Sequence, residues 1–363
     1  MKIAVFGLTI SSSWGNGHAT LWRGLCAALA RQGHRVVFFE HDTPYYAGNR
    51  DLFDLSGGDL VLYDDWESIR FRAKAELADA DAAIVTSYCP DAVAAADLIF
   101  GERCGLSVFY DLDTPVTLSR LRHGEAIPYI GGRGLADFDL VLSYTGGLAL
   151  DVLRRELGAR RVVPLYGHVD PQIHRPVEPK PHYRCDLSYL GTYSADRQDA
   201  LAALLIVPAR RFPERRFLIG GAQYPQDFPW CHNLYFVRHL PPSEHPAFFS
   251  SSRLTLNVTR APMAQLGWCP SGRLFEAASC GAAILSDTWE GLDAFFTPGQ
   301  EIFTANDSDG AMAALDADDA DIRRVAAAAR ERTLAQHTSE CRARELIAAL
   351  EARCAQSSEL EGV

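Results

Sequence analysis

The sequence predicts an α/β protein made of two successive Rossmann-like halves, each with a parallel sheet covered by helices. Short apolar runs typical of buried strands alternate with helical patterns in both halves of the chain. A proline-rich stretch without periodicity, 167–183, interrupts this alternation. The chain has 363 residues, more than one typical core contains, which also favours two domains.

The first half begins with a buried strand, a polar loop, a helix and a second strand, the order that opens a doubly wound domain. These elements are expected at 2–7, 11–17, 18–31 and 35–40. Later strands are expected at 59–64, 81–87, 106–111, 138–144 and 160–166, with helices at 67–77 and 90–100 among them. This half forms a predicted domain at 1–168, followed by a linker at 169–184.

The second half repeats the pattern and forms a predicted domain at 185–338. Its strands are expected at 185–191, 215–221, 233–239, 254–260, 282–286 and 301–305, with a helix near 195–210. The C-terminal part is helical from about 321 to 353, and a frayed tail is expected at 355–363. Two such halves would form a cleft between the carboxyl ends of their strands, where open α/β sheets bind ligands.

Composition excludes several classes of function. The net charge of −11 argues against a nucleic-acid partner or an anionic membrane surface, so an anionic ligand would need a local cluster of arginines. The apolar start is too short for a signal peptide, and no apolar run reaches membrane-spanning length. The nine cysteines are scattered and form no Cys-x-x-Cys, which favours reduced thiols in the cytoplasm and no zinc site.

The stretch 268–287 carries the clearest functional pattern. Ser271 is a good N-cap for a short helix, which should end at Gly281 before a buried strand. Arg273 and Glu276 share one face of that helix near its N-terminus, where free N–H groups and the helix dipole attract phosphate. Together they suit a nucleotide diphosphate, with Glu276 within reach of a ribose diol. A capped helix with an ordinary Arg/Glu pair is an equally good interpretation.

Two other places in the second half could support such a ligand. Gly191, Thr192 and Arg197 lie in a polar turn between a strand and a helix, which would offer backbone and hydroxyl donors to a phosphate. The alternative is an ordinary strand-to-helix turn. Arg260 ends the strand at 254–260, where it could neutralise diphosphate charge or pair with an acid.

The first half offers a candidate base. The loop glycines Gly15 and Gly17, with Asn16 between them, let the backbone approach a ligand on the acceptor side and present His18 at a helix start. His18 could take a proton from an acceptor hydroxyl, or be an ordinary surface histidine. The glycines lie too far from the first strand for a dinucleotide fingerprint, so NAD is disfavoured, although Glu40 resembles an acid that binds an adenosine ribose.

The acids near 111 have competing interpretations. Asp111 could orient or deprotonate an acceptor, whereas Asp113 is better explained by a helix start at Thr114 and Pro115. The two acids have Asp-x-Asp spacing, but they lie away from the predicted diphosphate residues. No metal site and no cofactor are therefore expected.

Taken together, these residues resemble GT-B-fold glycosyltransferases of the CgeB-like (spore maturation protein) branch, related to glycosyltransferase group 1. The motifs that carry the resemblance are LNVTR (256–260), SGRLFEAASCGAAILSD (271–287), LGTYSADRQ (190–198), WGNGHAT (14–20) and DTPVT (113–117). The resemblance covers nearly the whole chain and is most specific in the second half.

The resemblance implies a GT-B fold: two Rossmann-like domains that face each other across a cleft, with a C-terminal helix, 339–354, that crosses back to the first domain. Glu276 matches the acid that binds the donor ribose, and Arg273 and Arg260 fall where such enzymes hold the diphosphate. Gly191, Thr192 and Arg197 match the first loop of the donor half. His18 falls where several inverting members keep a catalytic histidine.

One departure concerns the stereochemistry of transfer. Many retaining relatives carry an E-x7-E pattern, and Trp268 stands where its first glutamate would be. Retention is therefore put in doubt, and His18 points towards inversion, without deciding between them.

The function implied is a metal-independent, hexosyltransferase-type glycosyltransferase with a nucleoside-diphosphate sugar as donor and an unidentified acceptor. The alternatives are a nucleotide-sugar epimerase on the same plan, an NAD(P)-linked enzyme, and a non-catalytic module that binds a nucleotide sugar.

Overall fold

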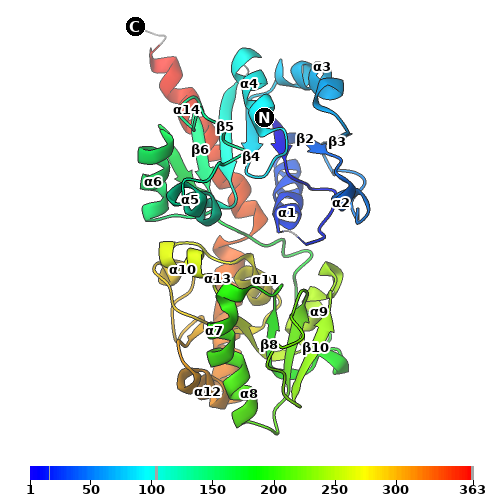
Figure 1. Cartoon of the computed structure of the whole chain (residues 1–363), viewed down its shortest axis with the longest axis vertical. Helices are drawn as coiled ribbons and strands as arrows, with labels where there is room; N and C mark the ends of the chain where they lie inside the picture. Colours follow the sequence, from blue (N-terminus) through cyan, green and yellow to red (C-terminus); the bar gives the residue numbers. More distant parts are fainter. Residues whose placement is uncertain (16, 103–104, 361–363) are drawn as a thin grey trace. The chain divides into compact units, whose positions relative to one another are not determined.

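The computed structural model describes residues 1–15, 17–102 and 105–360, and it contains two compact units (Figure 1). The first unit comprises Met1–Tyr166 and Ser339–Val363, and the second comprises Gly167–Thr338. The two ends of the chain therefore belong to the same unit. Among the described residues, no helix is both long enough and apolar enough to cross a bilayer.

The first unit is built on a seven-stranded sheet in the order β3-β2-β1-β4-β5-β6-β7, and every neighbouring pair is parallel. The strands are β1 Lys2–Gly7, β2 Arg35–His41, β3 Asp59–Tyr63, β4 Ala82–Thr86, β5 Leu106–Asp111, β6 Leu140–Ser143 and β7 Val162–Pro164. The central strands are buried on both faces, as a parallel sheet covered by helices requires. The strand order reverses between β1 and β4, so the ligand edge of this unit is expected where these two strands end.

The helices of this unit cover both faces of its sheet. They are α1 His18–Arg31, α2 Pro44–Ala47, α3 Trp66–Leu77, α4 Ala92–Glu102, α5 Thr114–Arg122, α6 Leu148–Leu157 and α14 Ser339–Leu360. The last helix, coloured red in Figure 1, packs against α1. Arg31 forms an ion pair with Glu340, and Leu346 and Leu350 are fully buried. The apolar contacts account for most of this packing, because an exposed ion pair contributes at most about 1 kcal/mol.

The second unit repeats the design with a six-stranded parallel sheet in the order β10-β9-β8-β11-β12-β13. Its strands are β8 Cys185–Leu190, β9 Phe217–Gly221, β10 Leu234–Arg238, β11 Ser252–Asn257, β12 Ala283–Ser286 and β13 Phe303–Thr304. Leu187, Phe217, Leu254 and Leu285 lie in its apolar core. Here the order reverses between β8 and β11, which places the ligand edge at the ends of those strands.

Short helices connect the strands of this unit, and one long helix closes it. They are η1 Pro181–Tyr183, η2 Ala195–Arg197, α7 Gln198–Leu201, η3 Ala202–Ile206, α8 Val207–Arg211, η4 Pro242–Glu244, α9 His245–Ser250, α10 Ala261–Leu266, α11 Gly272–Ser279, η5 Leu292–Ala294, α12 Ser308–Asp316 and α13 Asp319–Gln336. Helix α11 packs against α13 and β12. Gly281 follows α11 with φ +77°, as expected for a residue that ends a helix in the left-handed region.

Three local expectations from the sequence differ from the structure. The strand expected at 254–260 ends at Asn257, because Thr259 turns away and donates to Asp287 through its backbone N–H and its hydroxyl. The long C-terminal helix is two helices, separated at His337 and Thr338. Thr114, which the sequence favours as the N-cap residue, is the first residue of α5, so Asp113 occupies the N-cap position, although its side chain makes no capping hydrogen bond.

Candidate functional site

The second unit gathers most of the predicted donor residues where β8 and β11 end. Residues 191–197 follow β8, Arg260 follows β11, and Arg273 and Glu276 lie on α11. Tyr189, near the end of β8, is close enough to Arg197 and Arg273 for both guanidinium charges to oppose the rise in its pKa that burial causes. The position at which the strand order reverses therefore carries several cations, as an anionic ligand requires.

Helix α11 begins as its sequence predicts. The Ser271 hydroxyl accepts from the Arg273 backbone N–H at 3.3 Å, which makes Ser271 the N-cap. Arg273 Nη1 then donates to Glu276 Oε2 three residues further along the same face. Arg273 keeps 38% of its side chain exposed, whereas Glu276 keeps only 10%. The arginine can thus reach a ligand, while the carboxylate lies in a largely desolvated position.

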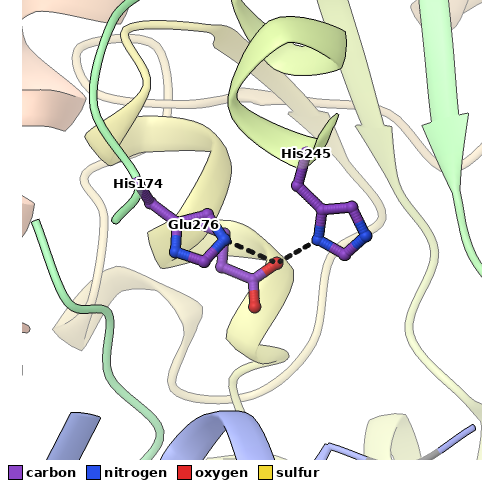
Figure 2. Close-up of side chains that lie close together, drawn as sticks. All are labelled: His174, His245 and Glu276. Atoms are coloured by element: carbon purple, nitrogen blue, oxygen red, sulfur yellow. Dashed lines mark ion pairs between the residues drawn. The ribbon is translucent and has the colours of Figure 1, made fainter. Parts of the chain in front are cut away.

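Two histidines complete the surroundings of Glu276. His174 comes from the connecting segment after β7, and His245 is the first residue of α9. Figure 2 shows both imidazoles pointing at the same carboxylate oxygen, with His174 Nε2 and His245 Nδ1 each 3.9 Å from Glu276 Oε2. Arg273 Nη1 also lies 3.1 Å from His245 Nδ1. All three members of the cluster are buried.

The charges in this cluster follow from burial and from Arg273. Burial, reinforced by Arg273, lowers the pKa of His245 to about 3, and burial also lowers the pKa of His174. Both imidazoles are therefore neutral at pH 7. Burial would raise the pKa of Glu276, but the neighbouring groups, Arg273 foremost among them, together hold that pKa well below its usual range. Because a guanidinium can only donate, His245 Nδ1 accepts from Arg273.

Among the described residues, His174, His245 and Glu276 also form a group that could hold a metal ion, since their ligand atoms lie within 4.8 Å of one another. Two imidazoles and a carboxylate are a ligand set that zinc uses. However, Arg273 Nη1 contacts both Glu276 Oε2 and His245 Nδ1, so a guanidinium already supplies the positive charge there. The arrangement fits a salt-bridged carboxylate better than a metal centre.

The other two predicted arginines are held in place by neighbouring loop residues. Arg260 is the exposed N-cap residue of α10, and its Nε lies 3.3 Å from Asp196 Oδ2. Arg197 Nη1 donates to the Thr192 carbonyl at 3.3 Å and approaches the Tyr189 hydroxyl at 3.4 Å. The loops after β8 and β11 are therefore tied together by Asp196, which the sequence did not single out.

Gly191 lies where two loops pack closely against each other. A Cβ on Gly191 would come within 2.7 Å of the Tyr189 hydroxyl. Its carbonyl accepts from Tyr224 at 3.1 Å, and the same carbonyl lies only 2.0 Å from where a Cβ on Gly221 would stand. The glycine thus serves local backbone packing, and Thr192 beside it offers its carbonyl to Arg197.

In the first unit, the loop after β1 is organised by Glu40. This carboxylate is fully buried at the end of β2 and accepts hydrogen bonds from the Thr9 hydroxyl, the Ile10 N–H, and both the N–H and hydroxyl of Ser11. The four hydrogen bonds therefore engage Glu40 within its own chain and leave its carboxylate little capacity to bind a ribose.

Further along the same loop, Gly15 has φ +69°, and a Cβ there would come within 2.8 Å of the Tyr45 hydroxyl. Gly17 is the N-cap residue of α1, where nothing lies within 4 Å of an added Cβ. Asn16 lies outside the described residues. The loop therefore needs a glycine at position 15 and delivers His18 at the start of α1.

His18 is paired with Asp113, the acid whose sequence context favoured a role in the start of a helix. His18 Nε2 lies 2.8 Å from Asp113 Oδ2, and the Ser87 hydroxyl donates to the same oxygen at 2.9 Å. Since a carboxylate only accepts, His18 Nε2 carries the proton and Nδ1 is the basic nitrogen. His18, Ser87 and Asp113 follow β1, β4 and β5, which places this pair at the reversal point of the first sheet.

Asp111 lies beneath this pair rather than in it. Its Oδ1 accepts from the Asp113 N–H at 3.1 Å and from the Thr117 hydroxyl at 3.0 Å. Its Oδ2 is buried and has no hydrogen-bond partner within the described ranges. Burial, followed by the charge of Asp113, raises the pKa of Asp111 to about 7. Asp111 therefore supports the turn that carries Asp113.

Comparisons with known proteins agree with this fold. A sequence model described as glycosyl transferase-like matches residues 197–348. A sucrose-phosphate synthase from Thermosynechococcus elongatus superposes with a TM-score of 0.65 at 16% identity, over 98% of this chain and 99% of that one. HepE of Anabaena in complex with UDP-glucose gives 0.66 at 13% identity, over 97% and 100%.

An α-glucosyltransferase in complex with UDP-glucose and DNA gives a TM-score of 0.69 at 13% identity, over 97% of this chain and 99% of that one. No curated protein matches the sequence significantly. At these identities the superpositions establish the architecture: the chain has the GT-B fold of glycosyltransferases, with two parallel-sheet Rossmann-like domains.

Proposed function

We propose that this protein is a glycosyltransferase that moves a sugar, of the hexosyl type, from a UDP-sugar to a hydroxyl acceptor without a metal ion. The observation that carries the proposal is the Arg273–Glu276 pair on α11, at the edge where β8 and β11 end. The glycosyl transferase-like match spans this helix. UDP is chosen because similarly folded proteins are described in complexes with UDP or UDP-glucose. The resemblance of 190–198 and 271–287 supports the CgeB-like branch.

In the donor half, hydrogen bonding to the ribose and neutralisation of the diphosphate charge would be carried out by different residues. Glu276, ionised and buried, would accept from the ribose hydroxyls. Arg273, Arg260 and Arg197 would balance the negative charge that develops on the departing diphosphate. Free N–H groups in the first turn of α11 add to this. The arginines and the helix N–H groups would then stabilise the negative charge of the diphosphate, a role that a divalent ion has in other transferases.

The acceptor half needs a base, and His18 with Asp113 provides one. Asp113 would fix the tautomer of His18 and stabilise the imidazolium that forms when Nδ1 takes the acceptor proton. The net charge of −11 favours a small or uncharged acceptor over DNA. The free thiols of the described cysteines support a reducing compartment such as the cytoplasm.

Metal independence is supported by the surroundings of Asp111 and Asp113, the two acids with Asp-x-Asp spacing in the first unit's candidate site. Asp111 is fully buried with a raised pKa, and Asp113 is hydrogen-bonded to His18 and Ser87. Neither carboxylate is arranged as a ligand for a divalent ion, which prefers ionised oxygens.

The test begins with a thermal-shift panel of UDP, GDP, ADP, dTDP, NAD and NADP, without metal. A nucleoside diphosphate at about a hundred times its dissociation constant should add roughly 2.7 kcal/mol to the free energy of unfolding. A shift with NAD or NADP alone would overturn the proposal.

Arg273→Ala should cost on the order of 1–3 kcal/mol of diphosphate affinity by calorimetry. Arg324→Ala is the matched control, because Arg324 is an exposed arginine of the same unit that forms an ion pair with Asp321 on its own helix. Equal losses in the two variants would refute the role of Arg273. With a UDP-sugar donor, His18→Ala should abolish transfer but keep UDP affinity, and EDTA should leave transfer unchanged.

A further inference from the structure

His174 is a buried histidine whose Nε2 is not used by the fold. Its exposed fraction is 3%, and the Ser279 hydroxyl donates to its carbonyl at 2.5 Å, which anchors the backbone of the connecting segment to the end of α11. Its Nε2 is buried and has no hydrogen-bond partner in the part of the chain that the structure describes. A buried, unpaired polar atom carries a desolvation cost, so its position needs an explanation.

The geometry around Glu276 Oε2 offers one. His174 Nε2 and His245 Nδ1 are both 3.9 Å from this oxygen, too far for a hydrogen bond (Figure 2). On the His245 side, Arg273 Nη1 stands between the two atoms and contacts both. On the His174 side, Nε2 has no hydrogen-bond partner among the described residues. A hydroxyl oxygen about 2.8–3.0 Å from both atoms fits that separation.

The charges select the kind of group that can stand there. His174 is neutral at pH 7, so an Nε2–H can donate, and the facing carboxylate favours that tautomer. Glu276 is ionised and can only accept. A group between them must therefore accept from the imidazole and donate to the carboxylate, which a hydroxyl does. A cation is not needed there, because Arg273 already neutralises the charge of Glu276.

We propose that His174 and Glu276 together bind one hydroxyl of the donor ribose, with the imidazole donating to it and the carboxylate accepting from it. This inference rests on the proposed function, because it assumes that a nucleoside diphosphate binds at α11. It adds a recognition residue from the connecting segment, and it makes the site selective for ribonucleotides over the analogue that lacks that hydroxyl.

The experiment is a mutant cycle between the residue and the ligand. Calorimetry would measure the affinities of UDP, 2′-deoxy-UDP and 3′-deoxy-UDP for the wild type and for His174→Phe; GDP or ADP and their deoxy analogues replace them if the panel selects those bases. His174→Phe should weaken UDP binding about five-fold, the effect of one neutral hydrogen bond, and leave one deoxy analogue unaffected.

Two further substitutions of His174 and one control substitution test the interpretation. His174→Met, which also lacks a donor, replaces the phenylalanine variant if that protein does not fold, and His174→Gln should restore part of the preference because its amide N–H can donate. His182→Phe is the control, since His182 is an exposed histidine in the same unit.

The outcomes separate the two proposals. Equal loss for UDP and both deoxy analogues would mean that His174 is only structural, and unchanged UDP affinity would also overturn the inference while the proposed function stands. If no nucleoside diphosphate binds the wild type, the proposed function itself fails, and the inference fails with it.

Discussion

Replacing Asp111 with asparagine should remove a pH dependence from the stability of the first unit. The carboxyl is fully buried, Oδ1 accepts two hydrogen bonds, and Oδ2 has no partner within the described residues. Burial and the charge of Asp113 raise the pKa of Asp111 from 3.8 to about 7. The folded protein therefore holds a proton that the unfolded chain releases at much lower pH.

The sign follows from proton binding. Between pH 3.8 and about 7 the native state binds more protons than the unfolded state, so the free energy of unfolding falls as pH rises. The stabilisation is complete below pH 3.8 and lost above about pH 7. At about 1.4 kcal/mol per pKa unit, the whole effect is about 4 kcal/mol, of which roughly 3 kcal/mol falls between pH 5 and 8.

Hydrogen exchange of the β5 and α5 amides, corrected for intrinsic rates and followed by mass spectrometry from pH 5 to 8, measures the opening free energy where Asp111 lies. The opening free energy of Asp111→Asn, relative to that of the wild type, should rise by roughly 3 kcal/mol between pH 5 and pH 8. Asp54→Asn is the control, because Asp54 is an exposed carboxylate of the same unit. A difference that stays constant with pH would refute the reasoning.

Three other substitutions test a buried hydrogen-bond network and the packing of two buried positions. Glu40→Gln removes the charge that accepts four hydrogen bonds in the loop after β1, and should cost about 2–4 kcal/mol in urea unfolding; a loss below 1 kcal/mol would contradict it. Leu346→Ala, at a fully buried position of α14, should cost about 2–5 kcal/mol; an unchanged unfolding midpoint would refute it. Gly291→Ala would place a Cβ 2.5 Å from the Trp268 ring and should lower the melting temperature more than Gly281→Ala, which shares a positive φ but meets no atom closer than 3.7 Å; equal losses would exclude the clash.

Much of the fold could be predicted because parallel sheets leave a strong pattern. Buried strands give continuous apolar runs, and β5 and α1 have the bounds that the sequence predicts, Leu106–Asp111 and His18–Arg31. The errors occur where a polar tertiary contact decides. Nothing local in LNVTR shows that Thr259 will bind Asp287 and end β11 at Asn257.

The candidate site was predicted best where its residues are close in sequence. Arg273 and Glu276 are three apart on one helix, so spacing alone places them together. His174 and His245 are 102 and 31 residues from Glu276 in the sequence, and only the folding of the second unit brings them close to it. The Asp113 position had a sufficient local explanation as a helix start, which concealed its contact with His18, 95 residues away.

The three carboxylates that are buried among the described residues show why residue type alone could not assign these roles. Glu40 is surrounded by hydrogen-bond donors from its own loop, so it has no capacity left for a ligand. Asp111 receives two such bonds and no cation, and its pKa is raised to about 7, so it carries less negative charge near neutral pH than an ordinary carboxylate. Glu276 is neutralised by Arg273, whose side chain is partly exposed, and Glu276 therefore stays ionised while keeping an oxygen within reach of new donors. Of the three, Glu276 has the charge and the hydrogen-bonding capacity that binding a polyhydroxylated ligand requires.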